Sequence, residues 1–233
     1  MKALVLSSGG CDSTTCLGMA VAEFGAENVA TVSVSYGQRN RKELESAQAV
    51  AAYYGVPHYD IDLSGTHILD ASQSTLLSHT DKSVSHESYA AQIAEDELGI
   101  VATYVPFRNG LFISAVTAQA LSLWPHEEST IFIGVHADDV AGAAYPDCTP
   151  EFIEAMGKAV NLGSYGLVTL RAPLVNLDKA GVVREGLKLH VPYELTWSCY
   201  EDGDIQCGEC ATCRDRRQAF EANGVTDPVP YAH

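Results

Sequence analysis

The stretch LVLSSGGCDSTT, residues Leu4–Thr15, places a short apolar run directly before two glycines and an Asp-Ser pair. The apolar run predicts a buried parallel strand, and the residues that follow predict a helix. Glycine lets the backbone turn sharply and approach a ligand closely. The free N–H groups of the first helical turn would then face an anion at the positive end of the helix dipole. The stretch therefore predicts a phosphate-binding loop, and a tight turn with a capped helix and no ligand is the alternative.

Apolar, β-branched segments alternate with helical segments along most of the chain. This alternation is typical of βαβ units, which build a parallel sheet covered on both faces. We therefore expect an α/β fold with a doubly wound, mainly parallel sheet that binds ligands at the carboxyl ends of its strands. The expected strands span residues 2–7, 29–36, 58–63, 129–136 and 167–174, and the expected helices span residues 12–25, 39–55, 109–124, 150–163 and 177–190.

Two segments depart from this alternation. Residues 64–97 form a polar stretch longer than ordinary connections, which predicts a lid or a poorly ordered segment. Residues 100–107, IVATYVPF, predict a strand or another extended segment. We expect two units, an α/β domain over residues 1–190 and a small cysteine-containing region over residues 191–233 packed on it.

The charge balance limits the classes of ligand. Fourteen Lys and Arg residues stand against thirty Asp and Glu residues, so the net charge is −16. This is the wrong sign for gripping nucleic acid through its phosphates. Local basic residues can still bind a small polyanion, because salt screens charge beyond about 8 Å. No apolar run approaches the roughly 18 residues of a membrane span, and the first one is too short for a secretory signal, so we expect a cytoplasmic protein without a membrane partner.

Seven cysteines without an export signal argue against a disulfide framework. Four of them, in SCYEDGDIQCGECATCRDR, have the spacing C-x7-C-x2-C-x2-C. Four thiolates can surround Zn²⁺ tetrahedrally and leave no open position, so such a site is structural. Free thiols and an iron–sulfur cluster are the alternatives. The predicted zinc ligands are Cys199, Cys207, Cys210 and Cys213.

The pattern S-G-G-x-D-S after an N-terminal strand resembles the pyrophosphate loop of the N-type ATP pyrophosphatases. With the cysteine tail and the motifs SYGQRN, TYVPFRNGLF, HADDVAGAAYPDC and LTWSCY, the chain resembles the 7-cyano-7-deazaguanine synthases of queuosine biosynthesis from Lys2 to about Phe220. The resemblance implies an adenine nucleotide alpha hydrolase-like fold. It also implies conversion of 7-carboxy-7-deazaguanine and ammonia to the 7-nitrile, with two ATP and Mg²⁺, through an adenylated carboxylate and an adenylated amide.

The resemblance also assigns roles to individual residues. Asp12, Lys179 and Arg108 would be catalytic, with Asp12 capping the first helix, holding Mg²⁺, or both. The implied ATP site comprises Ser7, Ser8, Gly9, Gly10, Cys11, Asp12, Ser13, Gln38 and Arg39. The implied substrate site comprises Arg108, Asn109, His136, Asp138 and Asp147, with Asp139 beside them. The alternatives are solvated positions for Gln38, Arg39 and Lys179, a helix cap for Asn109, a structural histidine, and an acidic loop.

The chain departs from the family pattern at two places. Phe107 stands where relatives often have glycine, and Thr149 follows Cys148 where many have arginine, which puts an anion contact at position 149 in doubt. Two other functions stay open. One is tRNA thiolation through a persulfide on Cys11 or Cys148, which the net charge of −16 disfavours. The other is a non-catalytic nucleotide-binding module. The oligomeric state is also open, with a homodimer among the alternatives.

Overall fold

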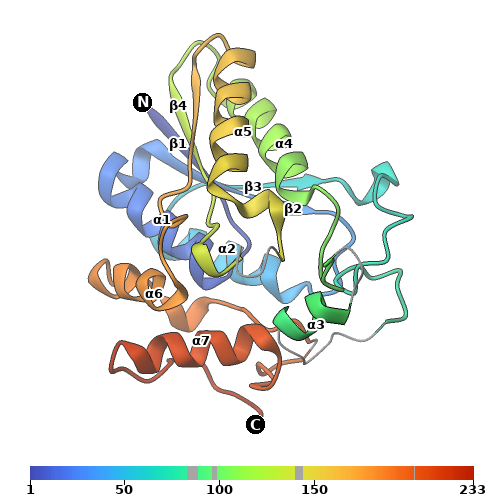
Figure 1. Ribbon diagram of the computed structural model, residues 1–233. Coiled ribbons are helices and arrows are strands. Elements are labelled where there is room, and N and C mark those ends of the chain that lie inside the picture. Colours follow the sequence, from blue (N-terminus) through green and yellow to red (C-terminus); the bar gives the residue numbers. More distant parts are fainter. Residues whose placement is uncertain (83–88, 96–98, 140–143, 202) are drawn as a thin grey trace.

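A single parallel sheet organises the computed structural model, as Figure 1 shows. The structure describes residues 1–82, 89–95, 99–139, 144–201 and 203–233. Within these residues the sheet has five strands in the order β3-β2-β1-β4-β5, and every pairing is parallel. The strands span Lys2–Leu6 (β1), Val29–Ser35 (β2), His58–Asp62 (β3), Ser129–Phe132 (β4) and Val168–Arg171 (β5).

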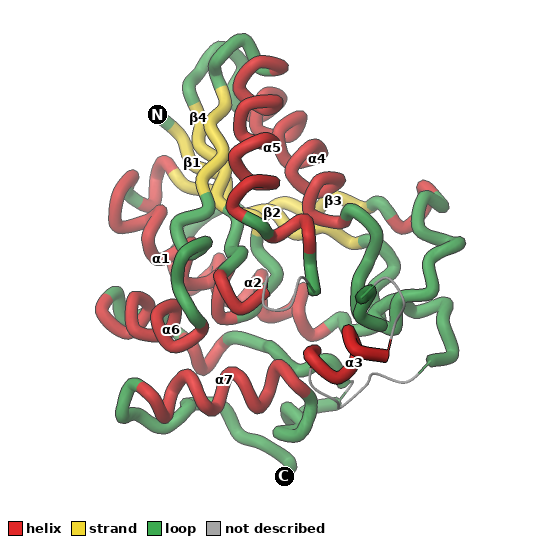
Figure 2. Tube along the Cα trace, viewed as in Figure 1, coloured by secondary structure: helices red, strands yellow, loops and turns green. Residues whose placement is uncertain are grey.

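Helices cover both faces of the sheet (Figure 2). One face carries α1 (Cys11–Phe24), α2 (Lys42–Tyr54) and α6 (Lys179–Lys188), and the other carries α4 (Arg108–Leu123) and α5 (Pro150–Gly163). Leu4 and Val5, neighbours in β1, are both fully buried but belong to different core clusters, with Ile113 of α4 and Leu17 of α1 respectively. Because successive side chains of a strand face opposite ways, a sheet covered on both faces needs continuous apolar strands. The predicted doubly wound α/β fold is confirmed.

The strand order changes direction at β1. The chain passes from β1 outward to β2 and β3, and then returns to β4 on the other side of β1. Loops that follow strands on the two sides of such a switch point diverge and leave a crevice at the carboxyl edge. Gly134, just after β4, lies so close to α1 that an added Cβ would be 2.9 Å from the backbone N of Ser13. The segments after β1 and β4 therefore meet at this crevice.

Residues 100–107 do not form the expected strand. Turns occupy residues 102–103 and 106–107. Val101 and Val105 are buried, but the segment forms turn bonds, such as that of the Tyr104 N–H to the Val101 carbonyl at 3.0 Å. It also accepts a bond from the Thr75 N–H at the Ala102 carbonyl at 2.9 Å, and no ladder joins it to a strand of the sheet among the described residues. The apolar pattern therefore reflects burial beneath a neighbouring loop and not pairing in the sheet, so the extended alternative holds and the strand is wrong.

The polar stretch over residues 64–97 has specific contacts in its described part. Leu77 is fully buried, and the hydroxyl of Thr80 donates to the carbonyl of Ser74 at 3.0 Å. A short helix, α3 (Tyr89–Glu95), follows. Residues 83–88 and 96–97 lie outside the described residues, and a lid at this stretch stays a prediction.

The last part of the chain packs against the sheet domain from below in Figure 1. α7 (Ala211–Ala222) lies along α6, and the fully buried Arg216 of α7 donates to both carboxylate oxygens of Asp227, at 2.7 and 2.9 Å. Trp197 donates its backbone N–H to the carbonyl of Gly9 at 2.9 Å. The C-terminal segment is therefore bonded directly to the loop after β1. No helix among the described residues is both long and apolar enough to span a bilayer.

Candidate active site

The loop after β1 has the backbone geometry of an anion site. Gly9 adopts φ +75°, and Gly10 caps α1 without a side-chain hydrogen bond. The Ser13 hydroxyl instead accepts from the backbone N–H of Ser8 at 3.2 Å and folds the loop over the start of the helix. Because the first N–H groups of a helix have no intrahelical partner, those of α1 remain available to a ligand. The side-chain oxygen of Ser7 is buried without a hydrogen-bond partner among the described residues.

Asp12 of α1 and Lys179 of α6 form an ion pair beside this loop. Lys179 Nζ lies 2.7 Å from both carboxylate oxygens of Asp12. His136 joins them, with its Nε2 3.8 Å from Asp12 Oδ2 and 3.5 Å from Lys179 Nζ. Burial opposes both charges, but the attraction between them holds the pKa of Asp12 below its usual value and that of Lys179 above it. Asp12 therefore does not cap α1 with its side chain; it keeps a lysine charged beside the loop after β1.

Acidic residues after β4 hold the start of α6 in place. Asp138 accepts the backbone N–H of Lys179 at 2.7 Å, and Asp139 accepts that of His136 at 3.0 Å. Asp178 caps α6 by accepting from Gly181 N at 2.7 Å. Burial raises the pKa of Asp139, although His136 opposes this. These contacts place Lys179 and His136 over the end of the sheet, from segments 43 residues apart.

A second cation lies at the start of α4. Arg108 donates to the Tyr36 hydroxyl at 3.5 Å, and its guanidinium carbon is 6.0 Å from the ring centres of Tyr36 and Phe112. Arg108 forms no ion pair with any carboxylate among the described residues. A guanidinium flanked by aromatic rings and free of a carboxylate can receive an anion from a ligand.

Asn109 and Asp147 hold the first turn of α4, where Arg108 lies. Asn109 donates its backbone N–H to Asp147 Oδ2 at 2.9 Å and its side-chain amide to the carbonyl of Asp147 at 3.1 Å. The amide also contacts Cys148 Sγ at 3.2 Å. The buried Asp147 carboxylate therefore caps α4. The sequence predicted Asp147 as a substrate contact, but it does not line the cavity that most of the other predicted site residues surround.

These groups surround one cavity of about 710 Å³ at the carboxyl edge of the sheet. Twelve predicted residues line it: Ser7, Ser8, Gly10, Asp12, Ser13, Gln38, Arg39, Arg108, Asn109, His136, Asp138 and Lys179. Gly9, Cys11 and Asp147 do not. Cys11 is fully buried, with its sulfur 3.8 Å from the Thr196 hydroxyl and 3.7 Å from that of Ser198, so it points into the C-terminal segment. Gly9 faces α2.

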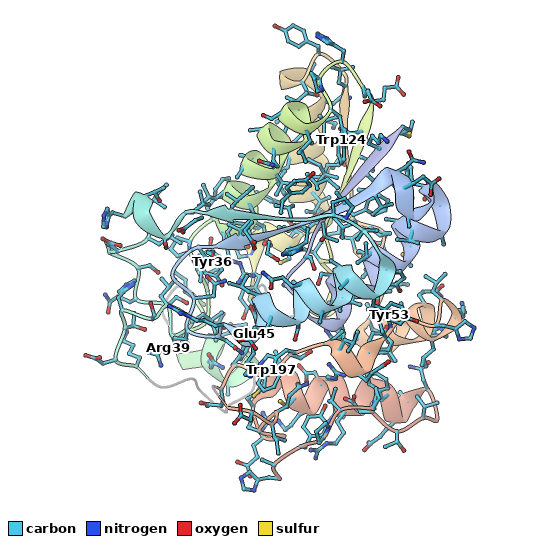
Figure 3. The ribbon with its side chains drawn as sticks, turned by 180° about the vertical axis from the view of Figure 1, so that it is seen from behind. Tyr36, Arg39, Glu45, Tyr53, Trp124 and Trp197 are labelled. Carbon is cyan, nitrogen blue, oxygen red and sulfur yellow. The ribbon has the colours of Figure 1, made fainter. Side chains whose placement is uncertain are left out.

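Gln38 and Arg39 shape the rim of the cavity through contacts with their own loops. Gln38 accepts the backbone N–H of Tyr36 at 2.8 Å. Arg39 donates to the carbonyl of Leu77 at 3.1 Å and to the carbonyl and hydroxyl of Thr80. Figure 3 shows Tyr36, Arg39 and Trp197 gathered at the same end of the molecule, far from Trp124. The guanidinium of Arg39 thus ties residues 77–80 to the cavity.

The sequence reading missed one wall of the cavity. Trp197, Ser198, Tyr200, Thr212 and Gln218 line it from the C-terminal segment. Glu43 lines it from the first turn of α2. The motif LTWSCY carried a signal for Trp197 and Ser198, but nothing local in the sequence distinguishes Glu43 from the solvent-facing acids of the same helix. Its position depends on how α2 packs.

The four predicted cysteines converge next to this wall. Their sulfur atoms all lie within 4.8 Å of one another, with Cys207–Cys213 at 3.9 Å and Cys199–Cys210 at 4.0 Å. Backbone N–H groups point at the sulfurs, including that of Cys210 toward Cys207 Sγ at 3.3 Å. Such donors stabilise thiolates, so the cluster could hold a metal ion. The side chain of Asn40, another residue not predicted, donates to the carbonyl of Cys199 at 2.6 Å.

The fold and the site define an α/β protein with a glycine loop before a helix at the switch point of a parallel sheet and, beside it, a cysteine cluster that could hold a metal ion. The sequence model of a family described as queuosine biosynthesis protein QueC matches residues 2–224. Proteins named 7-cyano-7-deazaguanine synthase from Oceanobacillus iheyensis and Methanoculleus marisnigri are each 42% identical to this chain. Each alignment covers 99% of this chain and 98% of the relative. The chain therefore belongs to the QueC family. Among solved structures, the NH3-dependent NAD synthetase of Campylobacter jejuni aligns with a TM-score of 0.47 and 14% identity over 83% of this chain and 66% of that one.

Proposed function

We propose that this chain is a carbon–nitrogen ligase that converts 7-carboxy-7-deazaguanine and ammonia to 7-cyano-7-deazaguanine, with two ATP consumed. The names of its relatives support the product. The observation that supports the chemistry best is the pairing of two cationic sites in one cavity, the loop with Lys179 and, separately, Arg108. In the proposed reaction two anions, a triphosphate and a carboxylate, must meet in that cavity, and each then has a cationic group to receive it.

In this proposal the loop and Lys179 bind the phosphates while the substrate carboxylate attacks the α-phosphate. Transfer of AMP to the carboxylate replaces a poor leaving group with a good one, and ammonia then displaces AMP to give the amide. Activation of the amide oxygen in the same way, followed by loss of AMP, gives the nitrile. In each round the N–H groups of α1 and the Lys179 ammonium stabilise the negative charge on the departing pyrophosphate. Arg108 orients the deazapurine acid against the loop.

Two metal ions belong to the proposal. Mg²⁺ usually binds through one or two carboxylates plus substrate phosphates, and Asp12 and Asp139, on either side of His136, offer such oxygens. Mg²⁺ would supply charge neutralisation of the phosphates. For the cysteines we propose structural Zn²⁺, since a tetrahedron with Zn–S bonds of about 2.3 Å has sulfur–sulfur edges of about 3.8 Å. The edges of 3.9 and 4.0 Å agree with this geometry. A cytoplasmic location would keep these thiols reduced.

Thiolation of tRNA finds less support. It needs a cysteine that is both accessible and ionisable. Cys11 points away from the cavity, and burial raises the pKa of the Cys148 thiol far above its usual value, with Asp139 and Asp147 adding to the effect. A non-catalytic nucleotide-binding module would not need the Arg108 site. The ligase therefore remains the proposal.

Product analysis tests the proposal directly. Purified protein incubated with 7-carboxy-7-deazaguanine, ATP, Mg²⁺ and ammonium should yield the nitrile by mass spectrometry, with two pyrophosphates released for each nitrile. Omission of ammonium should stop nitrile formation but still allow adenylation, which exchange of labelled pyrophosphate into ATP detects. Absence of both exchange and nitrile with this acid would contradict the proposed function.

A further inference from the structure

Glu43 stands out among the acids that line the cavity. The other described carboxylates there are those of Asp12, Asp138, Asp139, Asp178 and Asp215. The first four accept hydrogen bonds from protein groups, and Asp215 is exposed on α7. Among the described residues, the carboxylate of Glu43 has no hydrogen bond and no ion pair, and the residue is half-buried. An acid without a partner inside a cavity needs an explanation.

The position of Glu43 lies between the two cationic sites. Its backbone carbonyl packs against the phosphate loop, where a Cβ on Gly9 would come within 2.2 Å of it. Glu43 lines the cavity together with Arg108 and Tyr36, and the Arg108 charge acts to lower the pKa of its side chain. The carbon that accepts nitrogen must also lie between the loop, which holds phosphate, and Arg108, which holds the deazapurine acid. Glu43 therefore lines the same cavity as the loop and Arg108, where the reacting carbon of the proposed substrate would lie.

The proposed reaction needs a proton acceptor for nitrogen in both rounds. When ammonia attacks the adenylated acid, the new C–N bond forms, the C–O bond to AMP breaks with its electron pair, and one N–H proton must leave. When the adenylated amide becomes the nitrile, the electrons of an N–H bond form the third C–N bond as AMP departs, and the proton of that bond must leave. Three protons therefore leave nitrogen on the way from ammonia to the nitrile: one in the first round and two in the second, of which one leaves as the amide oxygen is adenylated and one as AMP departs.

We propose that the Glu43 carboxylate is the base that accepts the nitrogen-borne proton in both rounds. This inference rests on the proposed function. Asp12 is a weak base because its ion pair with Lys179 stabilises its charged form. Burial raises the pKa of Glu43 to about 7, although Arg108 opposes this, so the group can take a proton and return it to water between rounds. The Arg108 and Tyr36 side chains are the titratable groups that face it.

Separating adenylation from nitrogen transfer tests this role. Glu43→Gln should keep pyrophosphate exchange with the deazapurine acid within about threefold of the parent, because exchange needs no proton transfer from nitrogen. Nitrile formation should fall by about 10² to 10³-fold. In the parent, the rate of nitrogen transfer should decline as the pH falls below about 7, and the variant should lose this limb of the profile. Glu43→Asp, which keeps a carboxylate, should recover part of the rate.

Glu45→Gln is the matched control. Glu45 lies on the same helix, with 67% of its side chain exposed, and it pairs with Lys42 at the surface (Figure 3). This variant should match the parent in both assays. If Glu43→Gln forms nitrile with the parent rate and pH profile, the base is another group and the inference fails. If it loses exchange together with nitrile formation, Glu43 binds the deazapurine and the inference also fails. A parent without exchange would instead contradict the proposed function.

Discussion

At the level of single residues, burial decides what the charged groups of the cavity can do. Asp12 and Lys179 are 167 residues apart, and no pattern in either segment predicts that they meet; only the family resemblance nominated both. Their side chains are 24% and 16% exposed, so each charge depends on the other for compensation. Glu43 has the opposite environment, with a neutral form that burial favours.

The Asp12–Lys179 pair gives a first prediction. Lys179→Met leaves the Asp12 carboxylate without its partner, which should lower the free energy of unfolding by about 2 kcal/mol. It also removes the charge next to the phosphates, so pyrophosphate exchange should fall at least 100-fold. Lys158→Met, which breaks the exposed pair with Glu154 on α5, is the control and should change stability by less than about 0.5 kcal/mol. Exchange near the parent rate in Lys179→Met would remove Lys179 from the mechanism.

Glu43 gives a prediction about stability and pH. Because its pKa is raised from 4.5 to about 7 by folding, its contribution to stability is fully present below pH 4.5 and is lost as the pH rises through about 7. At pH 8, Glu43→Gln should therefore be more stable than the parent by about 1–2 kcal/mol, a value reduced because the group faces a cavity that water can enter. The two proteins should be alike near pH 4.5. Urea unfolding at both pH values measures the difference in unfolding free energy between the two proteins. An equal difference at both pH values would contradict the raised pKa of Glu43.

At the level of elements, the loop after β1 and helix α2 determine one another. The sequence assigned the glycines of this loop to close approach by phosphate. The structure gives Gly9 a different requirement, since it packs directly on the first turns of α2, and any side chain there would overlap the Glu43 carbonyl. This contact aligns the loop with α2 and so sets the position of the Glu43 side chain.

Gly9→Ala should therefore lower the free energy of unfolding by more than its positive φ alone explains. Gly37 is the matched control, because its φ is also positive, at +89°, but an added Cβ would meet nothing within 4 Å. Gly37→Ala should lower the free energy of unfolding by about 1–2 kcal/mol. Gly9→Ala should lower it further, by about 3 kcal/mol or more, and weaken ATP binding by calorimetry. Equal losses in both variants would show that α2 does not constrain the loop.

At the level of the whole molecule, the cysteine cluster is connected to the phosphate loop by hydrogen bonds. The carbonyl of Cys199 accepts from Trp197 Nε1 at 2.9 Å, and the backbone N–H of Trp197 donates to Gly9. The side-chain amide of Asn40, in the loop after β2, donates to the same carbonyl. Residues 191–233 thus complete the cavity. The division of the chain at residue 190 stays a prediction.

Loss of the proposed zinc should therefore weaken ATP binding at the loop after β1. Cys210→Ser should lose bound metal, lower stability by several kcal/mol and weaken ATP binding, because the cluster no longer holds Trp197 against the loop. Cys16→Ser is the control, since Cys16 is equally buried but lies on α1 outside the cluster. Metal analysis and calorimetry measure both effects. Unchanged metal content in Cys210→Ser would reject the ligand, and unchanged ATP affinity after metal loss would reject the connection.

The sheet, the helices on both of its faces and the cysteine cluster could be predicted from the sequence alone, because each depends on local periodicity or on residues close together in the chain. Phosphate binding by the loop after β1 stays a prediction. For residues 100–107 the sequence left a strand and another extended segment open, and the strand is wrong because burial under a loop imitates a strand pattern. Only the tertiary structure decided which groups face the cavity. It turned Cys11 and Asp147 away, and it brought in Glu43 and Trp197, since packing between distant segments sets the direction of a side chain and leaves no local mark.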